Sequence, residues 1–180
     1  MRLETARLVL RPVALTDAEA LCEMDADAEV RRWLDLPDAT PLEKIHTWLE
    51  SLGNLRERGP GMDFWAIEEK SSGQFLGWVH LKPFSISRVA RLHPELAVGD
   101  DEWDIGWRLQ RQSWGQGFAT EAAQALTHKA LEDWGASRLI AVALVGNTPS
   151  FRVMEKCGLR LEREFVYDNR LPAQKWSRVR

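Results

Sequence analysis

A strand, a long helix and a second strand follow one another in the second half of this 180-residue chain. Residues 103–109 have the pattern of a strand, residues 119–134 place apolar side chains at helical spacing, and Leu139–Val145 is a continuous apolar run. Such a run is typical of a strand covered on both faces, and Gly135 marks the end of the helix before it. Two strands joined by a helix of this length run parallel in one sheet. The segment therefore predicts a layered α/β fold.

The remaining elements are expected on either side of this βαβ unit. Strands are expected over residues 8–10, 64–67, 75–81, 159–167 and 174–179, and helices over residues 16–26, from 40 to a break at 57–61, and over 147–156. Thr16, Thr40 and Asn147 are expected to cap the three helices. Residues 85–101 are expected to form an irregular loop. No repeat or linker divides the sequence, so residues 1–180 are expected to form a single mixed α/β (α+β) domain.

Composition argues against several function classes. The 24 Lys and Arg residues are outnumbered by 27 Asp and Glu, whereas a protein that binds nucleic acid through phosphate contacts needs a basic face. The two cysteines, Cys22 and Cys157, have no zinc-like spacing, so neither a disulfide framework nor a metal site is expected. The cysteine usage fits a reducing cytosol, and no apolar stretch suits a signal peptide or a membrane span. We therefore expect a cytoplasmic protein that binds neither nucleic acid nor membranes.

The turn between the strand and the helix is the most informative segment. Gly115 and Gly117 let the backbone turn tightly and approach a ligand, while the free amides and the dipole of the next helix favour an anion such as phosphate. A P-loop would need a Gly-Lys-Ser/Thr tripeptide, which is absent. A dinucleotide site would need a small residue in place of Thr120 and an acidic residue after the next strand, where Val145–Asn147 has none. An ordinary glycine-rich turn is a further alternative.

Two motifs resemble those of the GNAT N-acetyltransferases. Gln112-Ser-Trp-Gly115-Gln-Gly117 resembles the family's Gln/Arg-x-x-Gly-x-Gly/Ala turn, and Asn147-Thr-Pro-Ser150-Phe-Arg-Val-Met-Glu-Lys156-Cys-Gly158-Leu resembles its Asn-x-x-Ser helix. Three further segments are similar to the ribosomal-protein-alanine acetyltransferases, the RimJ/RimL-like branch. They are Thr5-Ala-Arg7-Leu-Val-Leu-Arg11-Pro12, Phe75-Leu-Gly77 and Asp104-Ile-Gly106-Trp. The resemblance covers essentially the whole chain.

The resemblance implies a fold and an activity. The fold is a mixed, mostly antiparallel central sheet flanked by helices, with a parallel βαβ crossover that forms the acyl-CoA site. The activity is acetyl-CoA-dependent transfer of an acetyl group to a primary amine by direct attack in a ternary complex. The partners implied are acetyl-CoA as cosubstrate and a protein N-terminal α-amine or a small-molecule amine, with a homodimer left open. A donor such as succinyl-CoA and a non-catalytic acyl-CoA-binding module are alternatives.

The resemblance also implies which residues contact acetyl-CoA. The strand end would offer main-chain groups to the pantetheine and the thioester carbonyl, the turn would hold the pyrophosphate, and the second motif would reach the pantetheine amides and the sulfur. In that order the residues are Trp107, Arg108 and Leu109; Gly115, Gln116, Gly117, Phe118, Ala119 and Thr120; and Asn147 and Ser150. Gln112 and Trp114 are two further residues implied in cofactor binding. Trp114 would either stack on the adenine or cover the start of the helix. No metal is implied.

Two residues are candidates for proton transfer. Asp104 starts the strand that leads into the site and is the first candidate for the general base, acting through a water, with a solvated strand-edge carboxylate as the alternative. Glu102 and His80 are weaker candidates for this base. Ser150 is the candidate proton donor to the leaving thiolate, with an ordinary helix-start residue as the alternative. Met154 stands where many family members carry a tyrosine for that role.

Tryptophan is unusually frequent, with nine residues against one tyrosine. By the resemblance, most of the tryptophans lie on elements around the cofactor and acceptor cleft, namely Trp33, Trp48, Trp65, Trp78, Trp103, Trp107 and Trp114. Trp134 and Trp176 are expected in the core or at an edge. Aromatic walls suit a site that excludes water.

Overall fold

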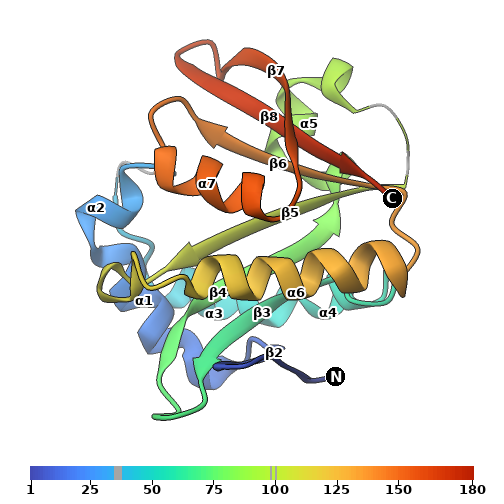
Figure 1. Ribbon diagram of the computed structural model, residues 1–180. Helices are drawn as coiled ribbons and strands as arrows, with labels where there is room; N and C mark the ends of the chain where they lie inside the picture. The colour runs from blue at the N-terminus through green and yellow to red at the C-terminus, as the bar shows by residue number, and fades with distance from the viewer. Residues whose placement is uncertain (35–37, 98, 100) are drawn as a thin grey trace. The chain divides into compact units, whose positions relative to one another are not determined.

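The apolar run at residues 139–145 forms β6 (Arg138–Leu144) in the computed structural model, which describes residues 1–34, 38–97, 99 and 101–180 (Figure 1). β6 pairs in parallel with β5 (Glu102–Leu109), and α6 (Phe118–Glu132) connects the two strands. Gly135 follows the helix with a φ of 84°, a conformation that favours glycine. The predicted βαβ crossover is therefore confirmed.

Burial along β6 is less uniform than its sequence suggests. Leu139, Ile140 and Ala141 are fully buried, whereas the three residues that follow them are half-buried. Val145 lies beyond the end of the strand and is 47% exposed. The prediction of a strand covered on both faces is therefore correct for the first half of the run and wrong for the second.

Strands of the described residues form one eight-stranded sheet in the order β1-β2-β3-β4-β5-β6-β8-β7. The other bounds are β1 (Leu3–Glu4), β2 (Leu8–Pro12), β3 (Asp63–Glu69), β4 (Phe75–Pro83), β7 (Arg160–Tyr167) and β8 (Leu171–Val179). The pairs β1–β2, β2–β3, β6–β8 and β7–β8 are antiparallel. Helices flank the sheet (Figure 1). A mixed, mostly antiparallel sheet was predicted and is confirmed; the short β1 was not expected.

The chain divides into two compact units. The first comprises Met1–His80 and Trp107–Ala122, and the second comprises Leu81–Gly106 and Ala123–Arg180. The helices of the first unit before residue 80 are α1 (Ala18–Ala26), α2 (Ala28–Arg31), α3 (Leu42–Ser51) and α4 (Gly53–Arg56), with the 3-10 turn η1 (Leu15–Asp17) before α1. Apolar side chains of β2 and β3, among them Leu8 and Ile67, are fully buried in this unit.

Two predicted helix caps in the first unit are wrong, because buried carboxylates determine the local structure. Asp17 accepts a hydrogen bond of 2.9 Å from the Ala14 N–H and two of 2.8 Å from Arg11. These bonds stabilise η1 and take the place of the cap predicted for Thr16. Thr40 donates its hydroxyl to Asp25 at 2.8 Å, and Pro41 takes the position before α3. Ion pairing and burial of these carboxylates outweigh a local capping bond.

The expected loop at residues 85–101 is also wrong for most of the residues described. The segment contains η2 (Phe84–Ile86), α5 (Arg88–Leu92) and η3 (Pro94–Leu96), while residues 98 and 100 lie outside the described part. Ser87 caps α5 by accepting the Ala90 N–H at 3.0 Å. Phe84, Ala90 and Leu96 are buried in one cluster with Ile140 of β6. The scattered apolar residues of this segment therefore build part of the core of the second unit.

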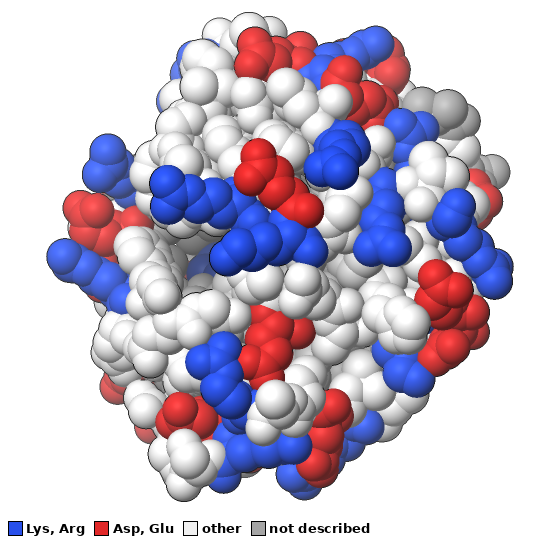
Figure 2. Space-filling model, viewed as in Figure 1, with Lys and Arg blue, Asp and Glu red and all other residues white. Residues whose placement is uncertain are grey.

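Basic and acidic side chains are both present across the face shown in Figure 2, where they are interspersed with uncharged residues. This agrees with the formal net charge of -3. Within the described residues, no helix is long and apolar enough to cross a membrane.

Candidate functional site

The turn between β5 and α6 has the conformation that its glycines predict. A 3-10 turn, η4 (Arg111–Ser113), precedes Gly115 and Gly117, whose φ angles are 75° and 82°. A Cβ at Gly115 would meet no atom within 4 Å, so the requirement for glycine there is conformational rather than steric. Gln116 donates its side-chain amide to the Gln112 carbonyl at 2.8 Å, which closes the turn on itself. The result is an exposed, preformed loop at the start of a helix.

The start of α6 supplies the main-chain groups of this site. Ala119 and Thr120 are half-buried, and they lie in the first turn, where N–H groups have no partner within a helix. Phe118 is buried, so its side chain belongs to the core and only its main chain can face a ligand. Free amides and the helix dipole together favour an anion at this end of α6.

Trp114 connects the turn to the end of β5. Its indole N–H donates to the Leu109 carbonyl at 2.9 Å, and the side chain is 41% exposed. The Gln110 N–H donates to the Leu76 carbonyl of β4 at 2.9 Å. The indole therefore covers the strand end and occupies one of the main-chain groups that the resemblance had assigned to cofactor binding.

The strand end is held against β4 by a very close approach of two backbones. A Cβ placed on Gly77, whose φ is 145°, would lie 2.2 Å from the Arg108 carbonyl oxygen and 2.6 Å from the Leu109 Cα. Real Cβ contacts are not this short, so only glycine fits at this position. Gly77 thereby fixes the position of the Trp107–Leu109 main chain relative to β4.

The Arg108 side chain lies in a buried ion pair. Its Nη1 donates to Asp25 Oδ1 of α1 at 2.5 Å, and the guanidinium lies 5.0 Å from the centre of the Trp78 ring. Burial lowers the pKa of Arg108, and the Asp25 carboxylate opposes this shift. Thr40 supplies a second hydrogen bond to Asp25. Sequence reasoning missed Asp25, because no local pattern connects residues 25 and 108.

An aromatic cluster adjoins this ion pair in the first unit. The Phe64 ring lies 4.8 Å from Trp48, 5.0 Å from Trp78 and 4.8 Å from His80, measured between ring centres. These contacts place Trp48 and Trp78 together, as an aromatic wall requires. Trp65 is only 2% exposed and donates its N–H to the Gly61 carbonyl, so its side chain belongs to the core of the first unit.

Arg7 and Glu121 form a further network at the start of α6 that the motifs did not predict. Glu121 accepts hydrogen bonds from the Thr5 hydroxyl at 2.6 Å, the Arg7 N–H at 2.8 Å and Arg7 Nε at 2.7 Å. Burial raises the pKa of Glu121, but these bonds outweigh it and hold the pKa below its usual value. Arg7 Nη1 also donates to the Gln116 carbonyl at 3.0 Å. The N-terminal turn is thereby joined to the glycine turn.

The second motif lies in the second unit and forms α7 (Thr148–Lys156), as predicted. The Asn147 side chain caps the helix by accepting the Ser150 N–H at 3.3 Å, which confirms the predicted cap. Ser150 is half-buried. Met154 is 2% exposed, so the position of the missing tyrosine is filled by a core side chain. Burial raises the pKa of the neighbouring Cys157 thiol to about 11, which makes it an unreactive core residue.

The two carboxylates among the candidate bases are held in ion pairs. Asp104 is 13% exposed in its side chain and lies 3.3 Å from Lys82 Nζ, so the alternative of a solvated carboxylate is wrong. Glu102 is buried at the start of β5 and lies 3.5 Å from Arg138. His80 is buried within the aromatic cluster.

The site residues fall into two sets. Trp107–Thr120 form one continuous strand, turn and helix start in the first unit, whereas Asp104, Asn147 and Ser150 belong to the second unit. Among the residues that the structure describes, no group of three or more His, Cys, Asp or Glu side chains is arranged to hold a metal ion.

Comparisons with known proteins connect this arrangement to one family. The sequence model of the acetyltransferase (GNAT) domain matches residues 7–160. The chain is similar to the FsC-acetyl coenzyme A-N(2)-transacetylase of Aspergillus fumigatus, with 30% identity over 183 residues that cover 99% of this chain and 74% of the relative.

Solved structures show the same fold. A GNAT-family acetyltransferase from Bacillus anthracis is 22% identical, with a TM-score of 0.78 over 99% of this chain and 98% of that chain. The RimL ribosomal L7/L12 alpha-N-protein acetyltransferase in complex with coenzyme A is 20% identical, also with a TM-score of 0.78 over 99% and 98% of the two chains.

Proposed function

The chain belongs to the GNAT acetyltransferases, and from this premise we propose that it transfers the acetyl group of acetyl-CoA to an α-amine by direct attack in a ternary complex. Residues 1–180 act as one catalytic domain in this proposal, which the coverage of the family match and of the Aspergillus relative supports. The two cysteines are free, which supports a reducing compartment such as the cytoplasm.

The glycine turn is the observation that carries the proposal. It is exposed, it contains two glycines with positive φ, and it opens onto the first turn of the 15-residue helix α6. These features fit the pyrophosphate of acetyl-CoA, which needs close main-chain approach and amide donors. In this proposal residues 115–120 hold the pyrophosphate, and Gln112 and Trp114 are further cofactor-binding residues of the same turn. Trp107–Leu109 and, from the second motif, Asn147 and Ser150 hold the pantetheine and the thioester.

A pair of matched variants tests this assignment. Gly115 and Gly73 have φ angles of 75° and 70°, and a Cβ at either would meet nothing within 4 Å. Gly115→Ala and Gly73→Ala therefore carry the same conformational cost, about 1 kcal/mol or more of stability. Calorimetry with acetyl-CoA should show weaker binding for Gly115→Ala alone. Equal affinities in the two variants, or no heat with the unaltered protein at millimolar acetyl-CoA, would overturn the proposal.

The choice of an α-amine rests on the free energy of deprotonation. Freeing a lysine amine at pH 7 costs about 4.6 kcal/mol, whereas an α-amine costs about 1 kcal/mol. The candidate carboxylates are both held by basic partners, which makes a strong base a poor expectation. The names of two similar proteins specify transfer to an N(2) position and to an alpha-amino nitrogen. These observations together favour an acceptor that needs little help to lose its proton.

A panel of acceptors tests this choice. Thiol release from acetyl-CoA is followed with peptides that have free N-termini, the same peptides with blocked N-termini and free lysines, amino acids, polyamines and aminoglycosides. Turnover is expected with free α-amines. Turnover with lysine side chains alone would contradict the proposal, and faster thiol release from succinyl-CoA than from acetyl-CoA would reassign the donor.

Proton transfer is proposed for two residues of the second unit. Asp104 accepts the proton of the acceptor amine through a water. Ser150 relays a proton to the leaving thiolate, and a neighbouring water replaces the proton that its hydroxyl gives up. Ser150 is half-buried and lies in the first turn of α7, while the Met154 thioether carries no proton to give. In this proposal the Ser150 hydroxyl therefore takes the role that a tyrosine at position 154 would have.

A further inference from the structure

Arg7 lies against the glycine turn although it comes from the opposite end of the first unit's sequence. Its Nη1 donates to the Gln116 carbonyl at 3.0 Å, and its guanidinium lies 4.5 Å from the centre of the Phe118 ring. A Cβ built on Gly117 would meet Arg7 Nη2 at 3.4 Å. The guanidinium therefore contacts Gln116 and Phe118 and lies beside Gly117, all in the segment proposed to hold the pyrophosphate.

The hydrogen bond to Gln116 fixes the direction of one peptide group. In a planar trans peptide the carbonyl and the next N–H point in opposite directions. Because the Gln116 carbonyl points toward Arg7, the Gly117 N–H points away from it. The φ of 82° at Gly117 lets this peptide plane differ from those of the helix that follows. Arg7 thus orients the Gly117 N–H within the turn that is proposed to donate hydrogen bonds to the pyrophosphate.

Glu121 holds Arg7 in this position and creates an electrostatic problem at the same time. It lies in the first turn of α6, where its carboxylate would repel a phosphate. Arg7 Nε pairs with Glu121 Oε2 at 2.7 Å, so the guanidinium compensates that charge while it binds the turn. The Arg7 side chain is still 48% exposed. One side chain therefore performs two tasks at the same site.

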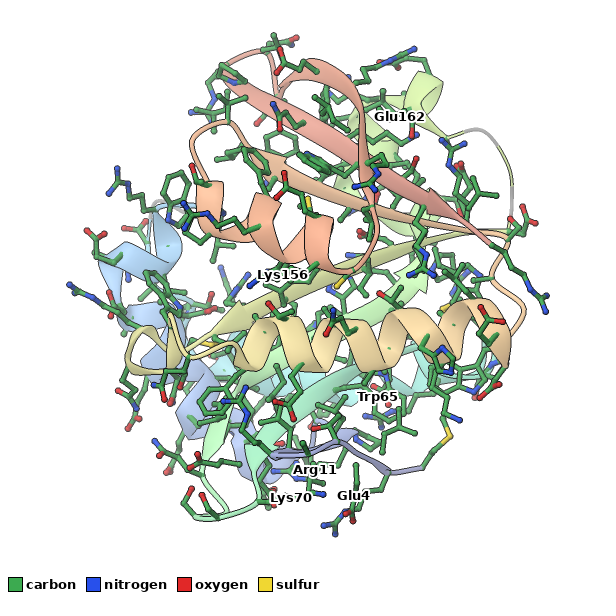
Figure 3. All side chains as sticks on the ribbon, viewed as in Figure 1. Glu4, Arg11, Trp65, Lys70, Lys156 and Glu162 are labelled. Carbon is green, nitrogen blue, oxygen red and sulfur yellow. The ribbon has the colours of Figure 1, made fainter. Side chains whose placement is uncertain are left out.

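Arg7 lies in the N-terminal hairpin, which consists of β1, β2 and the turn between them, and this hairpin is itself fixed in place. The Lys70 ammonium donates to the Thr5 carbonyl at 2.6 Å and lies 3.1 Å from the Glu4 carboxylate, and Figure 3 shows Lys70 and Glu4 side by side. The Lys70 N–H donates to the Arg7 carbonyl at 2.9 Å. These bonds hold the backbone at Arg7 independently of its side chain, so the side chain can be replaced without release of the hairpin.

From these contacts we infer that Arg7 is a positioning residue for cofactor binding: it orients the Gln116–Gly117 peptide and neutralises Glu121 beside the pyrophosphate. This inference rests on the proposed function, because it requires that acetyl-CoA bind at the glycine turn. It assigns to Arg7 no contact with the reacting atoms.

Four variants separate the two tasks of Arg7. Arg7→Ala removes both, and coenzyme A binding should weaken about tenfold or more, which corresponds to about 1.4 kcal/mol. Arg7→Lys keeps a cation but cannot contact Glu121 and Gln116 together, so it should recover part of the loss. The double variant Arg7→Ala/Glu121→Gln removes the carboxylate that Arg7 had neutralised and should also recover part of it. Arg2→Ala is the control, since Arg2 pairs with Glu4 at 3.6 Å on the same hairpin.

Calorimetry with coenzyme A gives the affinities, and urea unfolding of each variant confirms that it is folded. The ranking expected is Arg2→Ala equal to the unaltered protein, then Arg7→Lys and the double variant, then Arg7→Ala. A purely structural role predicts that the double variant binds no better than Arg7→Ala, and this result would overturn the inference. Equal affinities for Arg7→Ala and Arg2→Ala would also overturn it. Failure of the unaltered protein to bind coenzyme A would instead overturn the proposed function.

Discussion

Asp25 of α1 and Arg108 of β5 form a hydrogen-bonded ion pair with 2.5 Å between Oδ1 and Nη1, in which both side chains are largely buried. The pair joins the first long helix of the chain to the strand end proposed to hold the thioester. Burial of a charge costs free energy because the charge loses its hydration. The attraction between two buried charges offsets this cost only while both partners are present. We therefore expect that loss of one partner alone lowers the free energy of unfolding.

Replacement of Asp25 by Ala should lower the free energy of unfolding by about 3–5 kcal/mol, because it leaves the Arg108 guanidinium buried without its partner. The Thr40 hydroxyl loses its acceptor in the same variant. Urea unfolding measures the change. The double variant Asp25→Leu/Arg108→Met should recover most of the loss, since apolar side chains of similar size replace both charges. A double variant as unstable as Asp25→Ala would contradict this account.

Glu121 should make stability depend on pH in the acidic range. Its pKa in the folded protein is lowered, so its contribution to stability is complete above about pH 5 and is lost as the pH falls through the folded-state value. Glu121→Gln should therefore destabilise the protein at pH 7 by about 1.5–3 kcal/mol, the range for hydrogen bonds to charged groups. The difference from the unaltered protein should shrink toward pH 3. Urea titrations at several pH values test the sign, and a difference that grows with acidity would refute it.

Asp104 should determine the acidic limb of the pH–rate profile if it is the general base. Asp104→Asn should lower kcat and abolish that limb. Lys82→Met keeps the carboxylate but removes the ammonium 3.3 Å away, so the limb should persist and move to higher pH. The profile is measured with saturating acetyl-CoA and a peptide with a free N-terminus. An unchanged profile in Asp104→Asn would exclude this role.

Cys157 should be protected from thiol reagents in the native state. It is buried, with a pKa raised to about 11, whereas Cys22 is half-buried. Native protein at pH 8 should therefore label first at Cys22, and Cys157 should react only after addition of denaturant. Mass spectrometry of the labelled peptides identifies the site. Rapid native labelling of Cys157 would show that α7 opens locally near the second motif.

Features that depend on neighbours in sequence were predictable. The glycine turn, the Asn147 cap and the βαβ crossover each follow from residues a few positions apart, and each is present. Thr16 and Thr40 match a helix-start pattern equally well, yet Asp17 and Asp25 determine the structure there. A local rule fails where a buried carboxylate offers a stronger partner.

Features that join distant residues could not be predicted. Arg108 and Asp25 are 83 positions apart, and nothing in either neighbourhood indicates the pairing. The burial of Phe84, Ala90 and Leu96 likewise depends on Ile140, which no pattern in residues 85–101 indicates. Ion pairs and core clusters of this kind depend on how the chain folds, and no local sequence pattern indicates them.

The network around Glu121 also has a consequence for the order of events during synthesis. Its bonds to Thr5 and Arg7 join residues 116 and 114 positions apart, and the bond from Arg7 to Gln116 spans 109. During translation the N-terminal hairpin emerges long before α6 exists, and closure of such long loops is slow. The glycine turn can fold locally, but the bonds of Arg7 to Gln116 and Glu121 can both form only after residue 121 has left the ribosome. The nascent chain therefore completes the contacts of the glycine turn late, although Arg7 is synthesised 109 residues before Gln116.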